Sequence, residues 1–179
     1  MKKLKLICSA IAAFGLLALA GCDLEIDESD KVDVIPGFIM KGTATVNDGV
    51  GDMSFYFYPM YGTWSVTPTV DGSEKTTETV ASGEAWWSNV HSTHYEVADG
   101  STVEFKVTAK TASSVFTPFF EGNDGTNYIS INPNDGNAWG AATFSNQAYI
   151  STEFEEGSTY LFTVTRAGNA YTYTLGEAD

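Results

Sequence analysis

The chain has 179 residues, of which 43% are hydrophobic, and 23 acidic residues outnumber nine basic ones to give a formal net charge of −14. This acidity makes nucleic acid a poor partner because like charges repel, although solubility alone accounts for much of it. The length fits one domain with a core large enough to fold without disulfides.

The first 22 residues predict export. Three lysines precede an uncharged apolar run over 6–20, which is shorter than the roughly 20 apolar residues of a membrane-spanning helix and is typical of a cleaved secretory signal. The segment Leu19-Ala20-Gly21-Cys22 resembles the lipobox of bacterial lipoproteins, in which a lipid is attached to the cysteine and cleavage falls just before it. We therefore predict a signal peptide over 1–21 and a membrane-anchored lipoprotein lipidated at Cys22. The alternative is an ordinary signal with an accidental cysteine.

Cysteine usage agrees with this prediction. Cys8 lies in the segment expected to be removed, so lipidation of Cys22 leaves the mature chain with no thiol for a disulfide or a nucleophile. The mature chain keeps six basic residues against 23 acidic ones, a net charge of −17. A field of this sign also opposes sulfated or uronate-rich glycans, unless a bound cation or a local patch intervenes.

Residues 22–36 are expected to form a lipidated acidic tether, because they are rich in Asp and Glu and show no helical periodicity. Acidic residues directly after the cysteine resemble the surface-export signal of lipoproteins in some glycan-foraging Gram-negative bacteria. Asp23 beside the cysteine also resembles the inner-membrane retention signal of other Gram-negative bacteria. We favour the outer membrane and the cell surface, and the periplasmic face stays open.

From residue 37 onward the pattern predicts an all-β domain, an antiparallel β-sandwich or jelly roll over 37–179. Residues 102–110 alternate apolar and polar side chains, which is typical of a strand with one wet face. The runs 160–165 and 170–175 alternate in the same way around a Gly-containing turn and predict a hairpin. Further strands are expected at 38–46, 53–59, 63–69, 86–97, 115–120, 128–132 and 148–154.

Clusters of Gly, Asn and Asp separate these runs and predict turns. Carboxylate and carbonyl oxygens in such turns can also bind calcium. The candidate ligands of a structural calcium are Asp48, Asp52, Asp124 and Asp135. Ordinary turn chemistry explains the same residues without an ion, and no other cofactor is expected.

Several segments resemble a known family. Residues 116–122, Phe-Thr-Pro-Phe-Phe-Glu-Gly, and 127–131, Asn-Tyr-Ile-Ser-Ile, resemble the middle of a concanavalin A-like, laminin-G-type sandwich, and 159–169 resembles its late hairpin. Residues 86–97 and 100–105 are similar to noncatalytic, lectin-like β-sandwich lipoproteins that accompany polysaccharide-degrading enzymes in glycan-foraging bacteria. The resemblance spans roughly 83–175 and implies carbohydrate binding, with other surface glycan-uptake proteins as possible partners.

The sequence lacks the usual catalytic patterns. Glycan-cleaving sandwiches of this superfamily typically carry three closely spaced carboxylates on one strand, and no such trio occurs in the domain; Glu153 and Glu155 share a face but lack the third member. His91 and His94 lie three apart, which on a strand places them on opposite faces and makes shared metal binding awkward. We therefore expect no catalytic residues.

Aromatic rings mark the expected binding site, because a sugar's apolar face stacks on an aromatic ring while polar groups bind its hydroxyls. Trp64 shares its strand face with Val66 and is expected in the core, as are the rings of 55–58. Trp86 and Trp87 are adjacent, so a regular strand would point one of them away from the core. The predicted carbohydrate-binding residues are Trp86, Trp87, Asn89, His91, His94, Tyr95, Asn137 and Trp139, the last on a polar loop.

Three functions compete at this point. The first is a surface lipoprotein that binds a polysaccharide or oligosaccharide noncatalytically. The second is a structural or protein-binding surface lipoprotein. The third is a glycoside hydrolase or lyase on the same fold, which the missing carboxylate trio disfavours.

Overall fold

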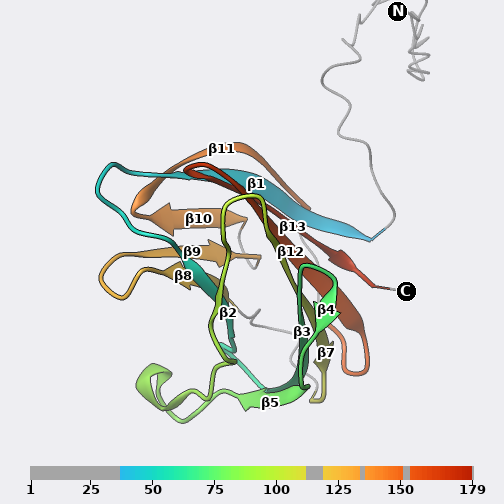
Figure 1. Cartoon of the computed structure of the whole chain (residues 1–179). Helices are drawn as coiled ribbons and strands as arrows, with labels where there is room; N and C mark the ends of the chain where they lie inside the picture. The colour runs from blue at the N-terminus through green and yellow to red at the C-terminus, as the bar shows by residue number, and fades with distance from the viewer. Residues whose placement is uncertain (1–36, 112–118, 134–135, 151–153, 179) are drawn as a thin grey trace, which may run out of the picture. The chain divides into compact units, whose positions relative to one another are not determined.

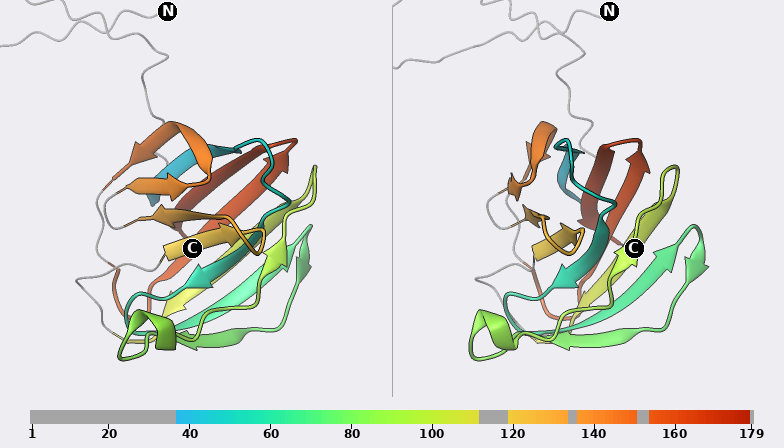
Figure 2. Two further views of the ribbon diagram at one scale, coloured as in Figure 1. Left: turned by 90° about the vertical axis from the view of Figure 1, so that its left-hand side faces the viewer. Right: turned by 60° about the vertical axis from the view of Figure 1, so that its left-hand side comes forward.

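The computed structural model describes residues 37–111, 119–133, 136–150 and 154–178. It confirms the all-β class, because two antiparallel sheets pack face to face as separate layers (Figures 1 and 2). Within these ranges, no helix is long and apolar enough to cross a membrane. The predicted signal peptide, Cys22 and the tether lie outside the described residues.

The larger sheet has eight strands in the order β11-β1-β13-β12-β7-β3-β4, and β5 also pairs with β3. Its strands are β1 (Phe38–Val46), β3 (Thr63–Val70), β4 (Ser73–Glu74), β5 (Glu78–Ala81), β7 (Thr102–Ala109), β11 (Ala142–Tyr149), β12 (Thr159–Ala167) and β13 (Ala170–Glu177). The predicted hairpin of β12 and β13 is confirmed, with Ala167 paired to Ala170 at its turn.

The smaller sheet has five strands in the order β10-β9-β8-β2-β6. They are β2 (Ser54–Tyr58), β6 (Tyr95–Glu96), β8 (Phe119–Asn123), β9 (Tyr128–Asn132) and β10 (Asn137–Gly140). Because side chains alternate across a strand, each of these strands contributes one set of residues to the core and the other set to an outer face.

Aromatic rings fill the space between the sheets. Phe120 of the smaller sheet stacks on Phe162 of the larger one, with ring centroids 3.9 Å apart. Phe57 and Trp64 meet across the same interface at 5.5 Å, and Trp64 is only 1% exposed, which confirms its predicted place in the core. Large buried rings of this kind supply much of the hydrophobic stabilisation of a small domain.

Gly122 shows how closely the smaller sheet packs on the core. A Cβ atom at this position would lie 2.9 Å from the Phe55 ring, which is closer than real contacts allow. The glycine therefore leaves room for Phe55 beneath β8, and its neighbours Glu121 and Asn123 point to the outer face.

The structure departs from several of the predicted elements. The strand expected over 115–120 is β8, which runs from Phe119 to Asn123, while residues 112–118 lie outside the described ranges. The expected strand over 86–97 is instead a 3₁₀ turn, η2 (Trp86–Ser88), followed by the two-residue strand β6. The expected strand over 148–154 is β11, which ends at Tyr149, while residues 151–153 lie outside the described ranges. The loop expected around Trp139 is the edge strand β10.

Candidate functional site

The outer face of the smaller sheet brings together residues that are far apart in sequence. The strand register aligns Tyr56 of β2 with Glu121 of β8, Glu121 with Ser130 of β9, and Ser130 with Trp139 of β10. These four side chains therefore form one row across the sheet. Neighbouring strands lie about 4.8 Å apart, so the row spans roughly 14 Å.

Glu121 stands at the centre of this row as a hydrogen-bond acceptor. Its Oε2 accepts a hydrogen bond from the Tyr56 hydroxyl, and its Oε1 accepts one from the Ser130 hydroxyl at 3.0 Å. Burial first, and then the hydrogen bond to Glu121, raise the pKa of Tyr56 well above its usual range. Tyr56 therefore stays protonated and keeps donating to Glu121, so the carboxylate is held in one position.

A pocket of about 380 Å³ opens beside this row. The register places Asn123 next to Tyr128, and the exposed Tyr128 ring forms part of the pocket wall. The pocket is lined by Tyr56, Glu121, Asn123, Gly125, Thr126, Asn127 and Tyr128. An aromatic ring beside carboxylate and amide groups can stack on a flat apolar face and bind the hydroxyl groups around it.

The turn between β8 and β9 is fixed by Asp124. This carboxylate accepts hydrogen bonds from the backbone N–H groups of Thr126 at 2.8 Å, Asn127 at 2.6 Å and Gly51 at 2.9 Å. It also accepts one from the Asn127 side chain at 2.9 Å. These bonds, that of the Asn127 side chain first, hold the pKa of Asp124 well below its usual range. Asp124 therefore caps the turn that forms one wall of the pocket.

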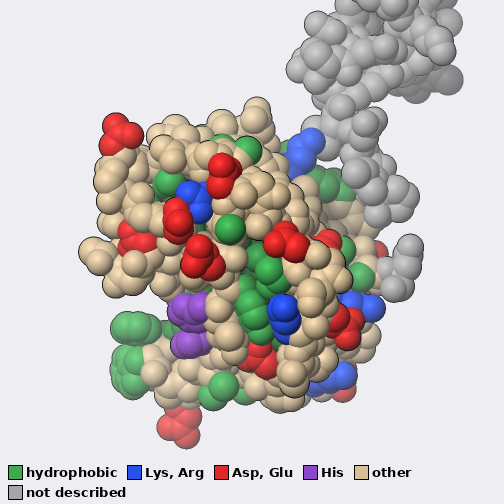
Figure 3. All heavy atoms as spheres, in the orientation of Figure 1, with side chains coloured by type: hydrophobic (Ala, Val, Ile, Leu, Met, Phe, Trp, Pro, Cys, Tyr) green, Lys and Arg blue, Asp and Glu red, His purple; other side chains and the backbone are tan. Residues whose placement is uncertain are grey.

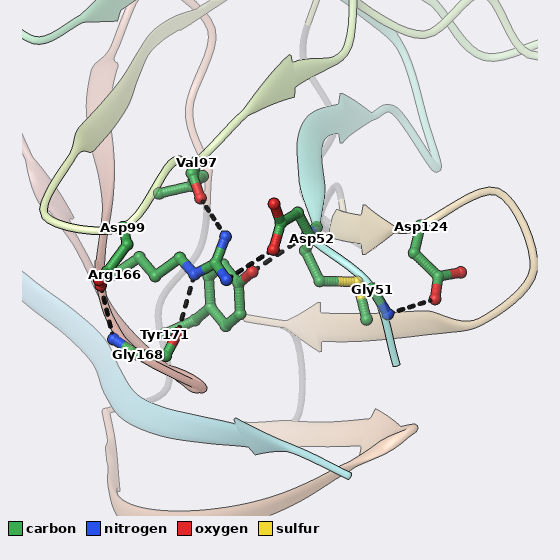
Figure 4. A network of polar contacts seen from close by, with 9 residues as sticks. Gly51, Asp52, Val97, Asp99, Asp124, Arg166, Gly168 and Tyr171 are labelled. Atoms are coloured by element: carbon green, nitrogen blue, oxygen red, sulfur yellow. Dashed lines mark hydrogen bonds and ion pairs between the residues drawn. The ribbon is translucent and has the colours of Figure 1, made fainter. Parts of the chain in front are cut away.

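A second set of polar contacts holds the segment that leads into β2 (Figure 4). Arg166 at the end of β12 forms an ion pair with Asp52, with Nη2 and Oδ1 2.6 Å apart, and its Nη1 donates to the Val97 carbonyl at 3.1 Å. The Tyr171 hydroxyl accepts a hydrogen bond from Met53 N–H at 3.0 Å. The loop before β2 is therefore tied to the larger sheet through Arg166 and to the pocket turn through Gly51.

The calcium candidates are dispersed in the structure. Asp52 pairs with Arg166, Asp124 caps its turn, Asp48 lies exposed between β1 and β2, and Asp135 lies outside the described residues. Among the residues that the structure describes, no group of three or more His, Cys, Asp or Glu could hold a metal ion. Structural calcium therefore stays a prediction from turn composition.

The two histidines cover Tyr56 on the outer side of the sheet. The His94 ring stacks on the Tyr56 ring with centroids 3.9 Å apart and an angle of 2° between the planes, and the His91 ring lies 5.0 Å from that of His94. Partial burial, and then His91, lower the pKa of His94, while Glu121 acts in the opposite direction. His94 Nδ1 also lies 3.5 Å from the Asn123 side-chain nitrogen at the edge of the pocket.

Trp86 and Trp87 are both exposed, at 70% and 74%, and their rings meet edge to face at 5.6 Å. The cause is the η2 turn rather than strand alternation, because Ser88 Oγ donates to the Ala85 carbonyl at 2.8 Å and closes the turn. The Tyr58 hydroxyl donates to the Trp86 carbonyl and attaches η2 to the end of β2. Figure 3 shows hydrophobic side chains at the position of η2, next to the two histidines.

The other predicted site residues differ in where the structure places them. Trp139 is 39% exposed in the outer row and packs edge to face on Phe119 at 5.3 Å, and Asn137 shares its strand face. The Asn89 side chain accepts from Gly83 N–H at 2.7 Å and donates to the Pro59 carbonyl at 2.9 Å, so it fastens the loop that carries η2. The structure turns Tyr95 toward the core instead, 6.1 Å from the Phe105 ring.

Sequence reasoning missed the pocket residues Tyr56, Glu121, Asn123 and Tyr128 as site residues. Glu121 and Asn123 belong to a run rich in Gly, Asn and Asp, which predicts a turn. The sequence did contain one indication of the strand. Phe120 and Gly122 alternate with the polar residues Glu121 and Asn123, and β8 accordingly extends to Asn123.

Comparison with protein-family models gives no match, and neither curated proteins nor solved structures match this chain. The geometry of the outer face is thus the basis for a functional proposal.

Proposed function

We propose that this domain binds carbohydrate noncatalytically through the outer face of its five-stranded sheet. The observation that carries the proposal is a pocket lined by Glu121 and the exposed Tyr128 ring on the outer face that also presents the exposed Trp139. The exposed η2 tryptophans are attached to the end of β2 of the same sheet. Stacking rings beside hydrogen-bonding groups match the two kinds of surface that a sugar presents. Large exposed rings are also uncommon on a soluble domain unless they contact something.

The residues that line the pocket suit noncatalytic binding better than glycoside hydrolysis. Glycoside hydrolysis ordinarily uses two carboxylates on either side of the scissile bond. Glu121 is the one carboxylate among the residues that line the described pocket, and both its oxygens accept hydrogen bonds from the protein. A release of reducing sugar from glycans incubated with the pure domain would contradict this part of the proposal.

A glycan array probed with the soluble domain, residues 37–179, tests the proposal. We expect binding to at least one glycan, and Trp139→Ala and Trp87→Ala should each weaken that binding by about tenfold, as the loss of a stacking ring would. Ile150→Ala is the matched control, because Ile150 is exposed but follows β11 of the other sheet. An array with no hit would refute the proposal.

We further propose that the protein is anchored by a lipid at Cys22 on the cell surface, supported by the signal and tether described above. Cys22→Ser should move the protein from the membrane fraction to the soluble fraction. Protease treatment of intact cells distinguishes the cell surface from the periplasmic face, since only a surface-exposed domain would be degraded.

The predicted structural calcium has a separate test. A change in the thermal unfolding midpoint on adding EDTA would support it.

Protein binding is the second candidate, and the exposure of Trp86 and Trp87 favours it, since tryptophan is enriched in the energetic centres of protein interfaces. Purification of the tagged protein in the absence of glycan tests it. A stoichiometric partner that is lost on Trp87→Ala but kept on Trp139→Ala would assign η2 to a protein contact.

A further inference from the structure

We infer that Glu121 makes the pocket selective for sugar units that present hydroxyl or amino donors and carry no acidic group. This inference rests on the proposed function and adds the chemical class of the ligand. It follows from how the carboxylate is held, from the charges around it and from the rings beside it.

The first step concerns the hydrogen-bonding capacity of Glu121. Its two oxygens offer about four lone-pair positions, and Tyr56 and Ser130 each occupy one, on different oxygens. A carboxylate only accepts hydrogen bonds, so any ligand group that binds it must be a donor. Two hydroxyl groups on adjacent sugar carbons can donate to the two oxygens side by side, as the paired N–H groups of arginine do.

The second step concerns charge. The residues that line the pocket include Glu121 and no Lys or Arg, and Asp124 in the adjacent turn is kept ionised by its hydrogen bonds. Arg166, the basic residue held near this end of the sheet, is paired with Asp52. An acidic sugar would therefore meet like charges, and the residues that line the described pocket offer no Lys or Arg to offset them. Hydroxyl donors and ammonium groups would be attracted instead.

The third step concerns shape. Tyr128 lines the same pocket as Glu121 and exposes about half of its surface, 54%. A sugar ring that stacks on Tyr128 would turn its rim hydroxyls toward neighbouring polar groups. Asn123 is paired with Tyr128 in the register and lines the pocket with Glu121, so stacking and hydrogen bonding can engage one sugar unit together.

The test uses three sets of immobilised oligosaccharides: neutral gluco-, manno-, galacto- and xylo-oligosaccharides, chitosan oligosaccharides that carry amines, and oligosaccharides that carry uronate or sulfate. We expect hits in the first two sets only. Glu121→Gln, which keeps the side chain's size but replaces one acceptor oxygen by a donor, should weaken binding of the best hit by at least about tenfold. Glu74→Gln on the exposed strand β4 of the other sheet should leave it unchanged.

The salt dependence of oligosaccharide binding can be measured on the unaltered protein, so this test does not depend on whether the variant folds. If charge causes the rejection, residual binding of acidic oligosaccharides should rise with salt concentration, because salt screens repulsion, while binding of neutral ones should stay nearly constant. Preferential binding of acidic oligosaccharides, or full binding by a folded Glu121→Gln variant, would overturn the inference and leave carbohydrate binding standing. No binding in any set would overturn the proposed function itself.

Discussion

The two sheets follow the same alternation, yet their outer faces differ in kind. On the larger sheet the outer residues are mostly threonines, which pair across strands through their hydroxyls, as Thr43 does with Thr172 at 3.3 Å and Thr108 with Thr159 at 3.0 Å. On the smaller sheet the outer row carries Tyr56, Glu121 and Trp139. The first is an ordinary solvated β surface, and the second combines rings with a fixed carboxylate.

The contrast shows which half of each strand concerns function. The inward residues of both sheets are alike, because both sheets must fill one core. The outward residues have no such shared requirement, so the two outer faces are free to differ, and the proposed binding is assigned to the face that carries exposed rings beside a carboxylate. Of the two described faces, the smaller sheet's has the composition of a binding surface.

The largest expected effect comes from the core that the two faces share. Phe162→Ala should lower the free energy of unfolding by about 3–5 kcal/mol, because it removes a buried ring that stacks on Phe120 at 3.9 Å. Urea denaturation followed by circular dichroism measures this. The proposed glycan binding should disappear at the same urea concentration as the fold. A loss of unfolding free energy below about 1 kcal/mol would show that the core rearranges to fill the space left by the ring.

A smaller loss of unfolding free energy is expected when the polar network shown in Figure 4 is broken. Arg166→Met should cost about 1–3 kcal/mol, because it leaves Asp52 without its partner and the Val97 carbonyl without its donor. Lys106→Met is the control, since Lys106 is exposed on the threonine-rich face and its loss should be nearly neutral. Equal costs for the two variants would mean that the network contributes no more than an ordinary surface charge.

Hydroxyl groups on the two faces provide a direct comparison. Ser130→Ala should cost about 1–2 kcal/mol, because Ser130 is buried and donates to the Glu121 carboxylate. Thr172→Ala removes an exposed hydroxyl pair and should change stability by less than about 0.5 kcal/mol. Chemical denaturation of both variants measures the two losses in unfolding free energy. A larger loss for Thr172→Ala than for Ser130→Ala would contradict the distinction drawn between the two faces.

The smallest expected effect is a pH dependence at His94. Its pKa is lowered in the folded protein, so between that pKa and the ordinary histidine value near 6.5 the unfolded chain binds more protons. Stability should therefore fall as the pH drops from about 7.5 to 5.5. The urea midpoint of His94→Gln should depend less on pH over this interval than that of the unaltered protein, and an identical dependence would assign the effect to other groups.

Much of the fold is predictable from local pattern. The strands over 38–46 and 128–132 were predicted to the residue, because alternation and flanking turn residues are local properties. The η2 turn was missed since a single serine bonding back to Ala85 overrides the extended pattern around Trp86.

The candidate site was harder to predict because it depends on register. Tyr56 and Trp139 are 83 positions apart in the numbering, and only the pairing of β2, β8, β9 and β10 puts them in one row. Turn composition around 121–125 also concealed the role of Glu121. Single tryptophans could be identified as candidates from the sequence, whereas the pocket lined by Tyr56, Glu121 and Tyr128 could not, because strand register brings these residues together.

The distribution of tryptophans gives the molecule its own optical probes. Trp64 is enclosed by the core, with its indole N–H donating to the Tyr61 carbonyl at 2.7 Å, and it reports on unfolding. Trp86, Trp87 and Trp139 are exposed to water at the candidate binding face. A ligand that covers them should shift their emission to the blue and shield them from iodide quenching, while the signal of Trp64 stays constant, so occupancy and stability can be read from one fluorescence spectrum without a label.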